Sequence, residues 1–479
     1  MEPQLLLAFL VYLAILLSIG LLAHKRSTTA SDFILGNRSL NFWVTALSAH
    51  ASDMSSWLFM AYPMLIFSKG LSFAWVAIGL ISGMWVNWHF VAPRLRRITE
   101  EQGSFTLSSF FESSVGDQGG KIRVLAAALS VLFLTHYLSA GLISMGLLFE
   151  SLFHLNYYAG ISIASAVVLA YTMYGGFVTV AWTDFFQGVF LLLMIVMVPL
   201  FATVTVGGFD TVIDAARIKH TYLSIFSDSI FENVEPILMG LAWGIGYLGM
   251  PHVLTKFMGI RDSNEMYKSK YVGITWQILA LLAATFVGLS GISLFPEGLV
   301  NDELIFVEMV QSLFPTFIVG FILCGVIAAT ISTMDSQILV VSSVLSEDFY
   351  KKSWNKEASS EDELRFTRMA VLGVTLLALS IALKRDTSIA DKVLYSWTGL
   401  GSSFGPLVLA CLFCKRITST AAISGMLVGS GMAMIWPHIE YIGSVNVPSM
   451  IVAFSCGLIT ILALSALTKR QVEDTKKPS

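Results

Sequence analysis

Long apolar segments separated by short polar ones run along almost the whole chain. Segments of about 17–30 mostly apolar residues are long enough to cross a bilayer as helices, and the chain contains thirteen of them. Their approximate limits are 4–24, 42–68, 72–92, 122–152, 158–174, 177–206, 231–256, 270–294, 315–345, 366–384, 389–413, 416–435 and 446–467. A shorter stretch at about 301–313 is typical of a helix outside the membrane. The pattern predicts an all-α polytopic protein of the lipid bilayer with about 13 transmembrane helices.

Composition supports this class and narrows the function. Of the 479 residues, 55% are hydrophobic and 13% are charged, whereas soluble domains carry about a quarter charged residues. The net charge of −3 gives no reason to expect a nucleic-acid partner, and no segment indicates an obligate protein partner. No loop is long enough for a nucleotide-binding domain, and no glycine-rich phosphate loop is present. Transport by this chain would therefore draw its energy from an ion gradient.

Basic residues predict how the spans are oriented. They follow the first, third, seventh, ninth and eleventh spans and also close the chain, at Lys25, Arg26, Arg38, Arg94, Arg96, Arg97, Lys256, Arg261, Lys268, Lys270, Lys351, Lys352, Lys356, Arg365, Arg368, Lys415, Arg416, Lys469, Arg470, Lys476 and Lys477. If the spans alternate, all these loops lie on one side, which the positive-inside rule assigns to the cytoplasm. The N-terminus is then outside and the C-terminus cytoplasmic. We expect one transport domain over 1–467 and a polar cytoplasmic tail over 468–479.

Two spans carry features that interrupt a helix. The second span contains a run of small polar residues, namely Ser48, His50, Ser52, Asp53, Ser55 and Ser56. The seventh contains Gly244, Gly246 and Gly249 followed by Pro251, which favours an unwound turn because proline lacks a backbone donor. Close helix packing through small residues is the alternative for these glycines. The two spans lie five apart and run in opposite directions, as a 5+5 inverted repeat over 42–206 and 231–413 requires. Helices 4–24 and 416–467 would be additions to it.

Three aspartates fall well inside spans, where an aspartate costs at least ~2.5–3.5 kcal/mol at the bilayer centre. Asp53 lies in the interrupted second span, and Asp184 and Asp335 are expected at similar depths, roughly 10 and 15 Å from the cytoplasmic ends of their spans. Such groups are kept where they face an ion, a cavity or a partner. No Lys or Arg falls in the middle of a predicted span. We therefore expect unwound backbone, helix N-termini or a bound cation to meet any charge on a substrate.

Hydroxyl groups line one face of the ninth span. Ala329, Ser332, Thr333 and Ser336 recur at i, i+3, i+4 and i+7. Opposite the carbonyls of an unwound helix, they could form an oxygen cage for a monovalent cation, or they could simply bond to carbonyls of their own helix. Four aromatic residues are candidates to wall a small amphipathic substrate, although packing is the usual role of such side chains: Trp57, Tyr137, Trp243 and Tyr247.

Five motifs together resemble the signatures of the sodium/solute symporter family. They are Ile34–Leu40 continued by 46–57, then 174–184, 243–252, 329–336 and 346–350. Within that family they are most similar to the bacterial sodium/proline symporters, and the resemblance runs from about residue 30 to residue 410. It implies a leucine-transporter-like fold and import of a small amino acid, L-proline first, with sodium across the bacterial inner membrane by alternating access.

The resemblance also implies roles for individual residues. Sodium would be bound by Ala51, Met54, Ala329, Ser332 and Thr333. Substrate would lie near Ser52, Met54, Trp57, Tyr137, Trp243, Tyr247 and Pro251. Asp53 and Ser55 match positions needed for sodium coupling, with Asp53 expected to organise the unwound turn, and Arg38 matches a cytoplasmic gate residue. Asp184, Ser332, Asp335 and Ser336 are a hypothetical second cation or proton site, since two facing carboxylates repel unless a cation lies between them.

The chain departs from the sodium/proline symporter pattern in ways that leave alternatives open. His50, Ser56 and Ala61 stand where those proteins have glycine, and Asp335 replaces a hydroxyl residue. Added side chains at Ser56 and Ala61 would narrow or repolarise a substrate pocket. Another small carboxylate or a sugar acid, such as sialic acid or pantothenate, remains an alternative substrate, and a transporter-like sensor and a channel remain alternative functions. No nucleophile–base pair indicates an enzyme.

Overall fold

The structure is a computed structural model that describes residues 3–23, 30–219, 224–226, 230–355, 357–385, 388–414, 416–439 and 447–474. Over these residues it is helical, with no strand beyond an isolated bridge between Leu40 and Ile260. The α-helices are α1 (Pro3–Ala23), α2 (Ala30–Leu35), α3 (Phe42–Met54), α4 (Ala61–Lys69), α5 (Trp75–Val86), α6 (Ala92–Glu101), α7 (Leu107–Val115), α8 (Lys121–Phe153), α9 (Tyr157–Thr205), α10 (Phe209–Lys219), α11 (Ile230–Gly246), α12 (Pro251–Met258), α13 (Met266–Leu294), α14 (Ile305–Leu313), α15 (Thr316–Ser343), α16 (Ser360–Ala382), α17 (Ile389–Phe413), α18 (Ser419–Ile435) and α19 (Ser449–Asp474).

Shorter helical pieces join several of these helices. The 3₁₀ pieces are η1 (Gly36–Arg38), η2 (Ser56–Leu58), η3 (Leu71–Ala74), η5 (Tyr247–Gly249), η6 (Ser263–Glu265), η7 (Asp302–Leu304) and η9 (Trp436–His438). The π-helical pieces are η4 (Asn87–Val91) and η8 (Val344–Trp354). Two of the 3₁₀ pieces, η2 and η5, lie inside predicted spans and interrupt them.

The helices agree with the predicted spans, and the last helix is longer than predicted. Among the described residues, ten helices are long and apolar enough to cross a membrane, or eleven if the bent pair α11 and α12 is one span. The two remaining predicted spans are the interrupted pair α3 and α4 and the shorter apolar stretch Tyr157–Ala170. The latter is the first part of α9, whose two helical parts meet at a kink at Gly176 (φ 63°, ψ 176°), between the predicted spans 158–174 and 177–206. Helix α19 continues through Asp474, beyond the predicted end of the last span.

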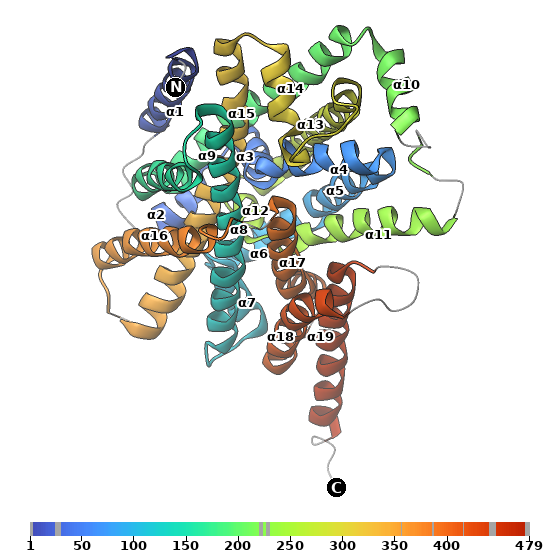
Figure 1. The fold of residues 1–479 in the computed structure, drawn as a ribbon. Helices are drawn as coiled ribbons and strands as arrows, with labels where there is room; N and C mark the ends of the chain where they lie inside the picture. The colour runs from blue at the N-terminus through green and yellow to red at the C-terminus, as the bar shows by residue number, and fades with distance from the viewer. Residues whose placement is uncertain are drawn as a thin grey trace.

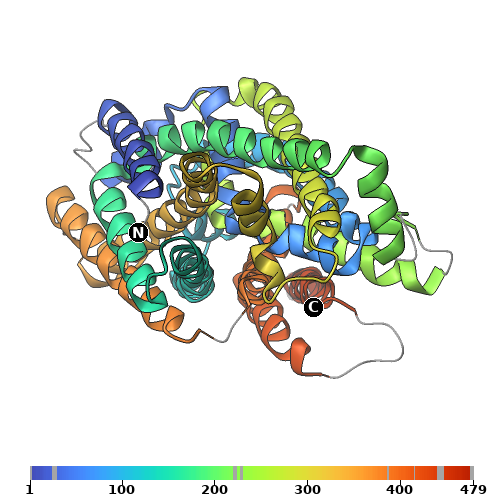
Figure 2. The same cartoon turned by 45° about the horizontal axis from the view of Figure 1, so that its top comes forward.

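Helices from both halves of the chain surround the interrupted segments. Figures 1 and 2 show α3, α4 and α12 near the middle of the molecule, with α8, α9, α13, α15 and α17 around them. Helix α3 packs against α9, α13, α12 and α15. Helices α18 and α19 pack against each other and against α17, on the side of the bundle where the chain ends (Figure 1).

Glycines allow an unusually close approach between α5 and α11. Gly79 faces Gly240 and Gly83 faces Gly244, so that a Cβ added at Gly83 would lie 2.1 Å from the carbonyl oxygen of Gly244. Both pairs follow the small-xxx-small spacing that lets backbones meet in membrane proteins. Gly244 therefore serves helix packing, which the sequence left open as the alternative for this residue, while the break in the seventh span begins after Gly246.

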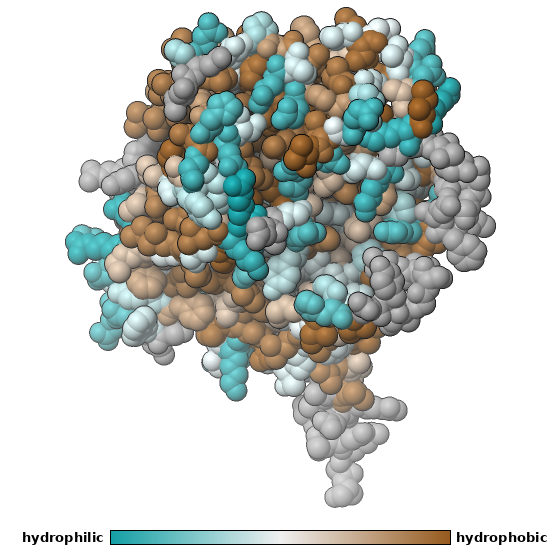
Figure 3. Space-filling model, viewed as in Figure 1, coloured by the Kyte–Doolittle hydropathy of each residue, from teal (hydrophilic) through white to brown (hydrophobic). Residues whose placement is uncertain are grey.

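The surface is that of a membrane protein. Broad apolar areas cover much of the face seen in Figure 3. Helix α1 alone exposes Leu6, Leu7 and Leu10 at 41%, 54% and 54%. Large exposed apolar surfaces of this kind are stable when lipid covers them.

Candidate functional site

The second span is interrupted directly after Asp53. Helix α3 ends at Met54, and Ser55 adopts φ 48° and ψ −168°, a backbone conformation that non-glycine residues rarely occupy. The Ser55 hydroxyl accepts a hydrogen bond from the Trp57 backbone N–H at 3.2 Å and so caps the short η2 piece. The chain regains α-helical structure at Ala61. The unwound turn predicted from the small polar run is confirmed, and Ser55 is the residue at its corner.

The seventh span is interrupted at the predicted place. Helix α11 ends at Gly246, Met250 is extended, and α12 begins at Pro251 after a bend of 50°. Gly249 packs against the backbone of α17, where a Cβ would lie 2.7 Å from the Leu400 carbonyl oxygen. The break thus combines a proline that starts a helix with a glycine that allows close backbone contact.

Asp53 joins the two interruptions. Its carboxylate accepts a hydrogen bond from the hydroxyl of Tyr247 in η5, and its backbone carbonyl accepts one from the Tyr137 hydroxyl at 3.4 Å. Tyr247 is itself held by Gln277, whose amide donates to the tyrosine hydroxyl at 3.0 Å, and by Asn87, whose amide donates to the tyrosine carbonyl at 3.0 Å. These contacts fit the expectation that Asp53 organises the unwound turn.

Three of the predicted substrate residues lie together. The ring centroids of Trp57 and Trp243 are 4.9 Å apart, and Trp397 stands 5.5 Å from Trp243 and 5.0 Å from Tyr247. Trp57 also stacks on Tyr62 at 5.1 Å. The indole Nε1 of Trp57 is buried and has no hydrogen-bond partner among the described residues. The sequence did not single out Trp397 or Tyr62 because isolated aromatic residues in apolar spans are usually packing.

The other predicted substrate residues are placed differently. Ser52 bonds back to the Ala49 carbonyl of its own helix at 3.1 Å, and Met54 is buried at the end of α3. Pro251 lines a cavity that also has several hydroxyl residues in its wall, namely Thr106, Ser108, Ser130, Thr255 and Ser343.

Oxygen atoms converge where α15 meets α3. The Ser332 hydroxyl donates to the Ala51 carbonyl at 2.9 Å and also lies 3.1 Å from the Ala329 carbonyl. The Thr333 hydroxyl donates to the Ala329 carbonyl at 3.0 Å. These hydrogen bonds link four of the five residues predicted for sodium. Ser332 bonds its own helix and also reaches across to α3, so both sequence interpretations stay open.

A second polar cluster surrounds Asp184, on α9. Its Oδ2 atom accepts hydrogen bonds from Ser48 at 2.7 Å and from Ser336 at 3.4 Å. The same oxygen lies 2.9 Å from the Lys256 ammonium nitrogen, and the two side chains are 0% and 2% exposed. The sequence placed Lys256 at the end of the seventh span and did not predict its contact with Asp184. The bend between Gly246 and Pro251 directs α12 and its lysine into the bundle.

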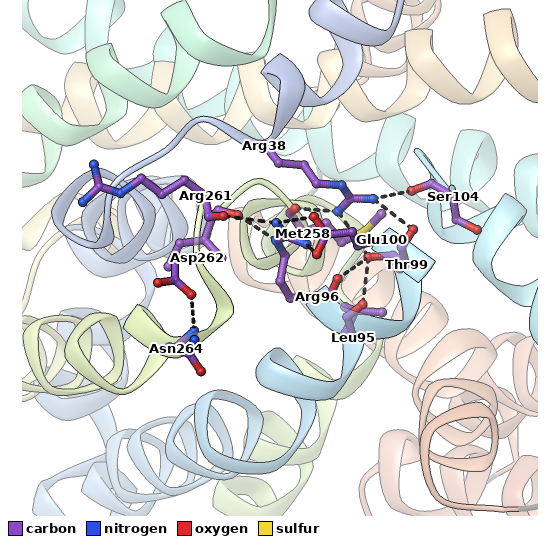
Figure 4. Close-up of polar contacts among 11 residues, drawn as sticks. Arg38, Leu95, Arg96, Thr99, Glu100, Ser104, Met258, Arg261, Asp262 and Asn264 are labelled. Atoms are coloured by element: carbon purple, nitrogen blue, oxygen red, sulfur yellow. Dashed lines mark hydrogen bonds and ion pairs between the residues drawn. The ribbon is translucent and has the colours of Figure 1, made fainter. Parts of the chain in front are cut away.

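Arg38 holds together three segments on another part of the molecule (Figure 4). Its guanidinium donates to the carbonyls of Met258 at 2.7 Å, Thr99 at 3.0 Å and Ser104 at 3.0 Å. Nearby, Arg96 donates to the Ile260 carbonyl at 2.7 Å. Burial lowers the pKa of Arg38 to about 10, so the side chain stays charged at neutral pH. We call this group, with the Leu40–Ile260 bridge, the Arg38 cluster.

Comparison with known proteins shows to which family the chain belongs. The model of the sodium:solute symporter family matches residues 33–429. The chain belongs to the sodium:solute symporter family. It is 40% identical to the high-affinity proline transporter PutP of Bacillus subtilis (strain 168) over 95% of this chain and 96% of that protein. It is 38% identical to a sodium/proline symporter of Staphylococcus aureus (strain JH9) over 96% of this chain and 92% of that protein.

Solved structures agree on the fold. A sodium-coupled sialic acid symporter in a substrate-bound outward-open state aligns with a TM-score of 0.82 at 18% identity, over 97% of this chain and 98% of its own. Mhp1, a nucleobase-cation-symport-1 family transporter, aligns with a TM-score of 0.60 at 15% identity, over 95% and 96%. The chain therefore has the predicted leucine-transporter-like fold and is a multi-pass sodium-coupled transporter of small molecules, not an enzyme.

Proposed function

We propose that this chain imports L-proline together with sodium by alternating access. The observation that carries the sodium part is the contact of the Ser332 hydroxyl with the Ala51 carbonyl, which joins α15 to the interrupted second span. The substrate part rests on the proline transporters that resemble the chain over nearly all of its length.

Sodium would bind among the oxygens that already converge between α3 and α15. The carbonyls of Ala51 and Ala329 and the hydroxyls of Ser332 and Thr333 are hard, uncharged oxygen ligands. Unwound backbone carbonyls serve this purpose in secondary transporters. The two hydroxyls would rotate to present lone pairs to the ion, and the Met54 carbonyl would complete the set. Binding would thereby hold the end of α3 against α15.

L-Proline would lie where the two interruptions face each other. The tryptophans Trp57 and Trp243 would contact its apolar ring, and Tyr137 and Tyr247 would flank it. The carboxylate would be met by backbone N–H groups near the start of η2, beside Ser52 and Met54, because helix N-termini favour anions. Pro251 and its hydroxyl-lined cavity would belong to the path by which substrate leaves the site.

Asp53, Ser55 and the Asp184 cluster would couple the ion to the substrate. Asp53 connects the sodium-binding helix with Tyr247 of the substrate site, and Ser55 fixes the turn between them. Asp184, Asp335, Ser332 and Ser336 would form a further cation-binding or proton-binding region. The Arg38 cluster would be the closed cytoplasmic gate, since it fastens the end of α12 to α6 and to the chain before α3.

The placement in the cell is part of the proposal. The chain would lie in the bacterial inner membrane with its N-terminus outside and its C-terminus in the cytoplasm. Residues 1–467 would form one transport domain, built from a repeat over 42–206, an inverted repeat over 231–413 and additional helices at each end.

Ser56 and Ala61 are the reason to test which substrate the chain transports. Both are buried, Ser56 in η2 and Ala61 at the start of α4, where the sodium/proline symporter pattern has glycines. Purified protein in proteoliposomes should be given labelled L-proline with an excess of unlabelled L-proline, other amino acids, sialic acid or pantothenate. The proposal expects L-proline to compete most strongly. Stronger competition by sialic acid or pantothenate would identify that acid as the substrate in place of L-proline. The proposed sodium coupling would be unaffected.

A further inference from the structure

Four helices direct polar side chains to one buried point. Asp184 comes from α9, Ser48 from α3, Ser336 from α15 and Lys256 from α12, and the last three all contact the same carboxylate oxygen. Each of these side chains is nearly or completely buried. An ammonium in this environment is stable only when an anion pairs with it, because an unpaired buried charge is strongly destabilising.

A second buried acid, Asp335, lies near the Asp184–Lys256 pair. Asp335 is 0% exposed and lies within electrostatic range of both Asp184 and Lys256. Neither of its carboxylate oxygens has hydrogen-bond geometry with a described group, although Ser336 lies close by. The Asp184 carboxylate and two serine hydroxyls around one point offer oxygen ligands for a small cation, and the Asp335 carboxylate lies near enough to add its charge to that of Asp184. Lys256 brings a cation to that set from within the chain.

The lysine is held in place by its own short helix. Helix α12 carries Lys256 two residues before Met258, whose carbonyl accepts the hydrogen bond from Arg38. The ammonium also faces the ring of Phe177 at 5.3 Å from the centroid. The contacts that fasten α12 therefore also keep the ammonium against Asp184.

We propose that the Lys256 ammonium is a tethered cation that fills a second cation site at Asp184 and Asp335. The chain then takes only one sodium from solution, at the site between α3 and α15. This inference rests on the proposed sodium coupling and adds its stoichiometry. It also explains how a second buried acid is tolerated near Asp184, since a cation bound to one carboxylate reduces the repulsion between the two.

Equilibrium binding of ²²Na⁺ to the purified full chain tests the proposal without any substrate. The wild type and Lys256→Arg should each bind one sodium per chain, whereas Lys256→Met should bind two. Lys270→Met is the matched control, because Lys270 is also buried but pairs with His89; it should bind one. The double variant Lys256→Met/Asp184→Asn removes both charges of the pair and should return to one.

Each outcome decides between the alternatives. One sodium bound by a folded Lys256→Met, or two bound by the wild type, overturns the tether while leaving sodium coupling intact. No sodium bound by the wild type overturns the proposed function itself. If Lys256→Met folds poorly, its thermal unfolding midpoint should rise with sodium chloride more steeply than that of the wild type, with N-methylglucamine chloride as the control salt. A sodium-specific rise no steeper than that of the wild type would identify Lys256 as a purely structural ion-pair partner.

Discussion

The hydroxyl of Tyr247 donates a hydrogen bond to the carboxylate of Asp53, and this contact links the interruptions of two helices from opposite halves of the chain. Asp53 is adjacent to Met54, where α3 ends, and Tyr247 begins the short η5 piece. Because the carbonyl of Ala51 meets Ser332 only two residues earlier, the sodium-binding oxygens and the aromatic cluster are mechanically connected through Asp53.

Tyr247→Phe should weaken this connection while keeping the aromatic ring. A hydrogen bond to a charged group contributes about 1.5–3 kcal/mol, so the sodium concentration for half-maximal uptake should rise about tenfold to a hundredfold. Initial rates of L-proline uptake at a series of sodium concentrations give this value. Tyr62→Phe is the control, since that hydroxyl bonds Thr285 and does not touch Asp53. Equal sodium dependence in Tyr247→Phe and wild type would show that Asp53 acts alone.

Ser332→Ala should weaken sodium binding directly. It removes the hydroxyl that contacts both Ala51 and Ala329, so the apparent sodium affinity should fall at least about tenfold. Ser342→Ala, on the same helix, removes a hydroxyl that bonds only the Leu339 carbonyl and should leave sodium affinity unchanged. Matching losses in the two variants would place the ion elsewhere.

The sequence predicted most of this arrangement because the signals were local. A run of small polar residues and a glycine–proline cluster are local interruptions of helix geometry, and both breaks lie where they were expected. Hydroxyls spaced on one face of a helix likewise predicted the α15 side of the oxygen cluster.

Contacts between distant segments were beyond the reach of such reasoning. The direction in which α12 leaves the break decides that Lys256 meets Asp184, and no local pattern encodes a bend of 50°. Trp397, Gln277 and Asn87 complete the site from helices outside the two breaks. Their partners could be found only from the packed structure.

Gly83→Ala should destabilise the protein without touching the binding site. The added Cβ would lie 2.1 Å from the Gly244 carbonyl, so α5 and α11 would have to separate. Overpacking of this kind typically costs 1–3 kcal/mol, and the thermal unfolding midpoint in detergent should fall by several degrees. Gly373→Ala is the control, because a Cβ there meets nothing within 4 Å. An unchanged midpoint for Gly83→Ala would contradict the close glycine contact.

Arg38→Gln should open the proposed cytoplasmic gate. The variant loses the guanidinium that bridges Met258, Thr99 and Ser104. A Thr255→Cys reporter in a background without native cysteines should then react faster with an impermeant maleimide added to the cytoplasmic face. Arg97→Gln, at an exposed position of the neighbouring α6, is the matched control. No change in labelling rate would indicate that Arg38 has another role.

Sodium-driven accumulation of L-proline by the purified chain is the most direct test of the account. Proteoliposomes with an inward sodium gradient should concentrate labelled L-proline above its external level, and the accumulated label should leave when a sodium ionophore abolishes the gradient. Ser332→Ala should lose most of this accumulation at low external sodium. Uptake that is the same with an inward sodium gradient and with choline in place of sodium would contradict the central claim.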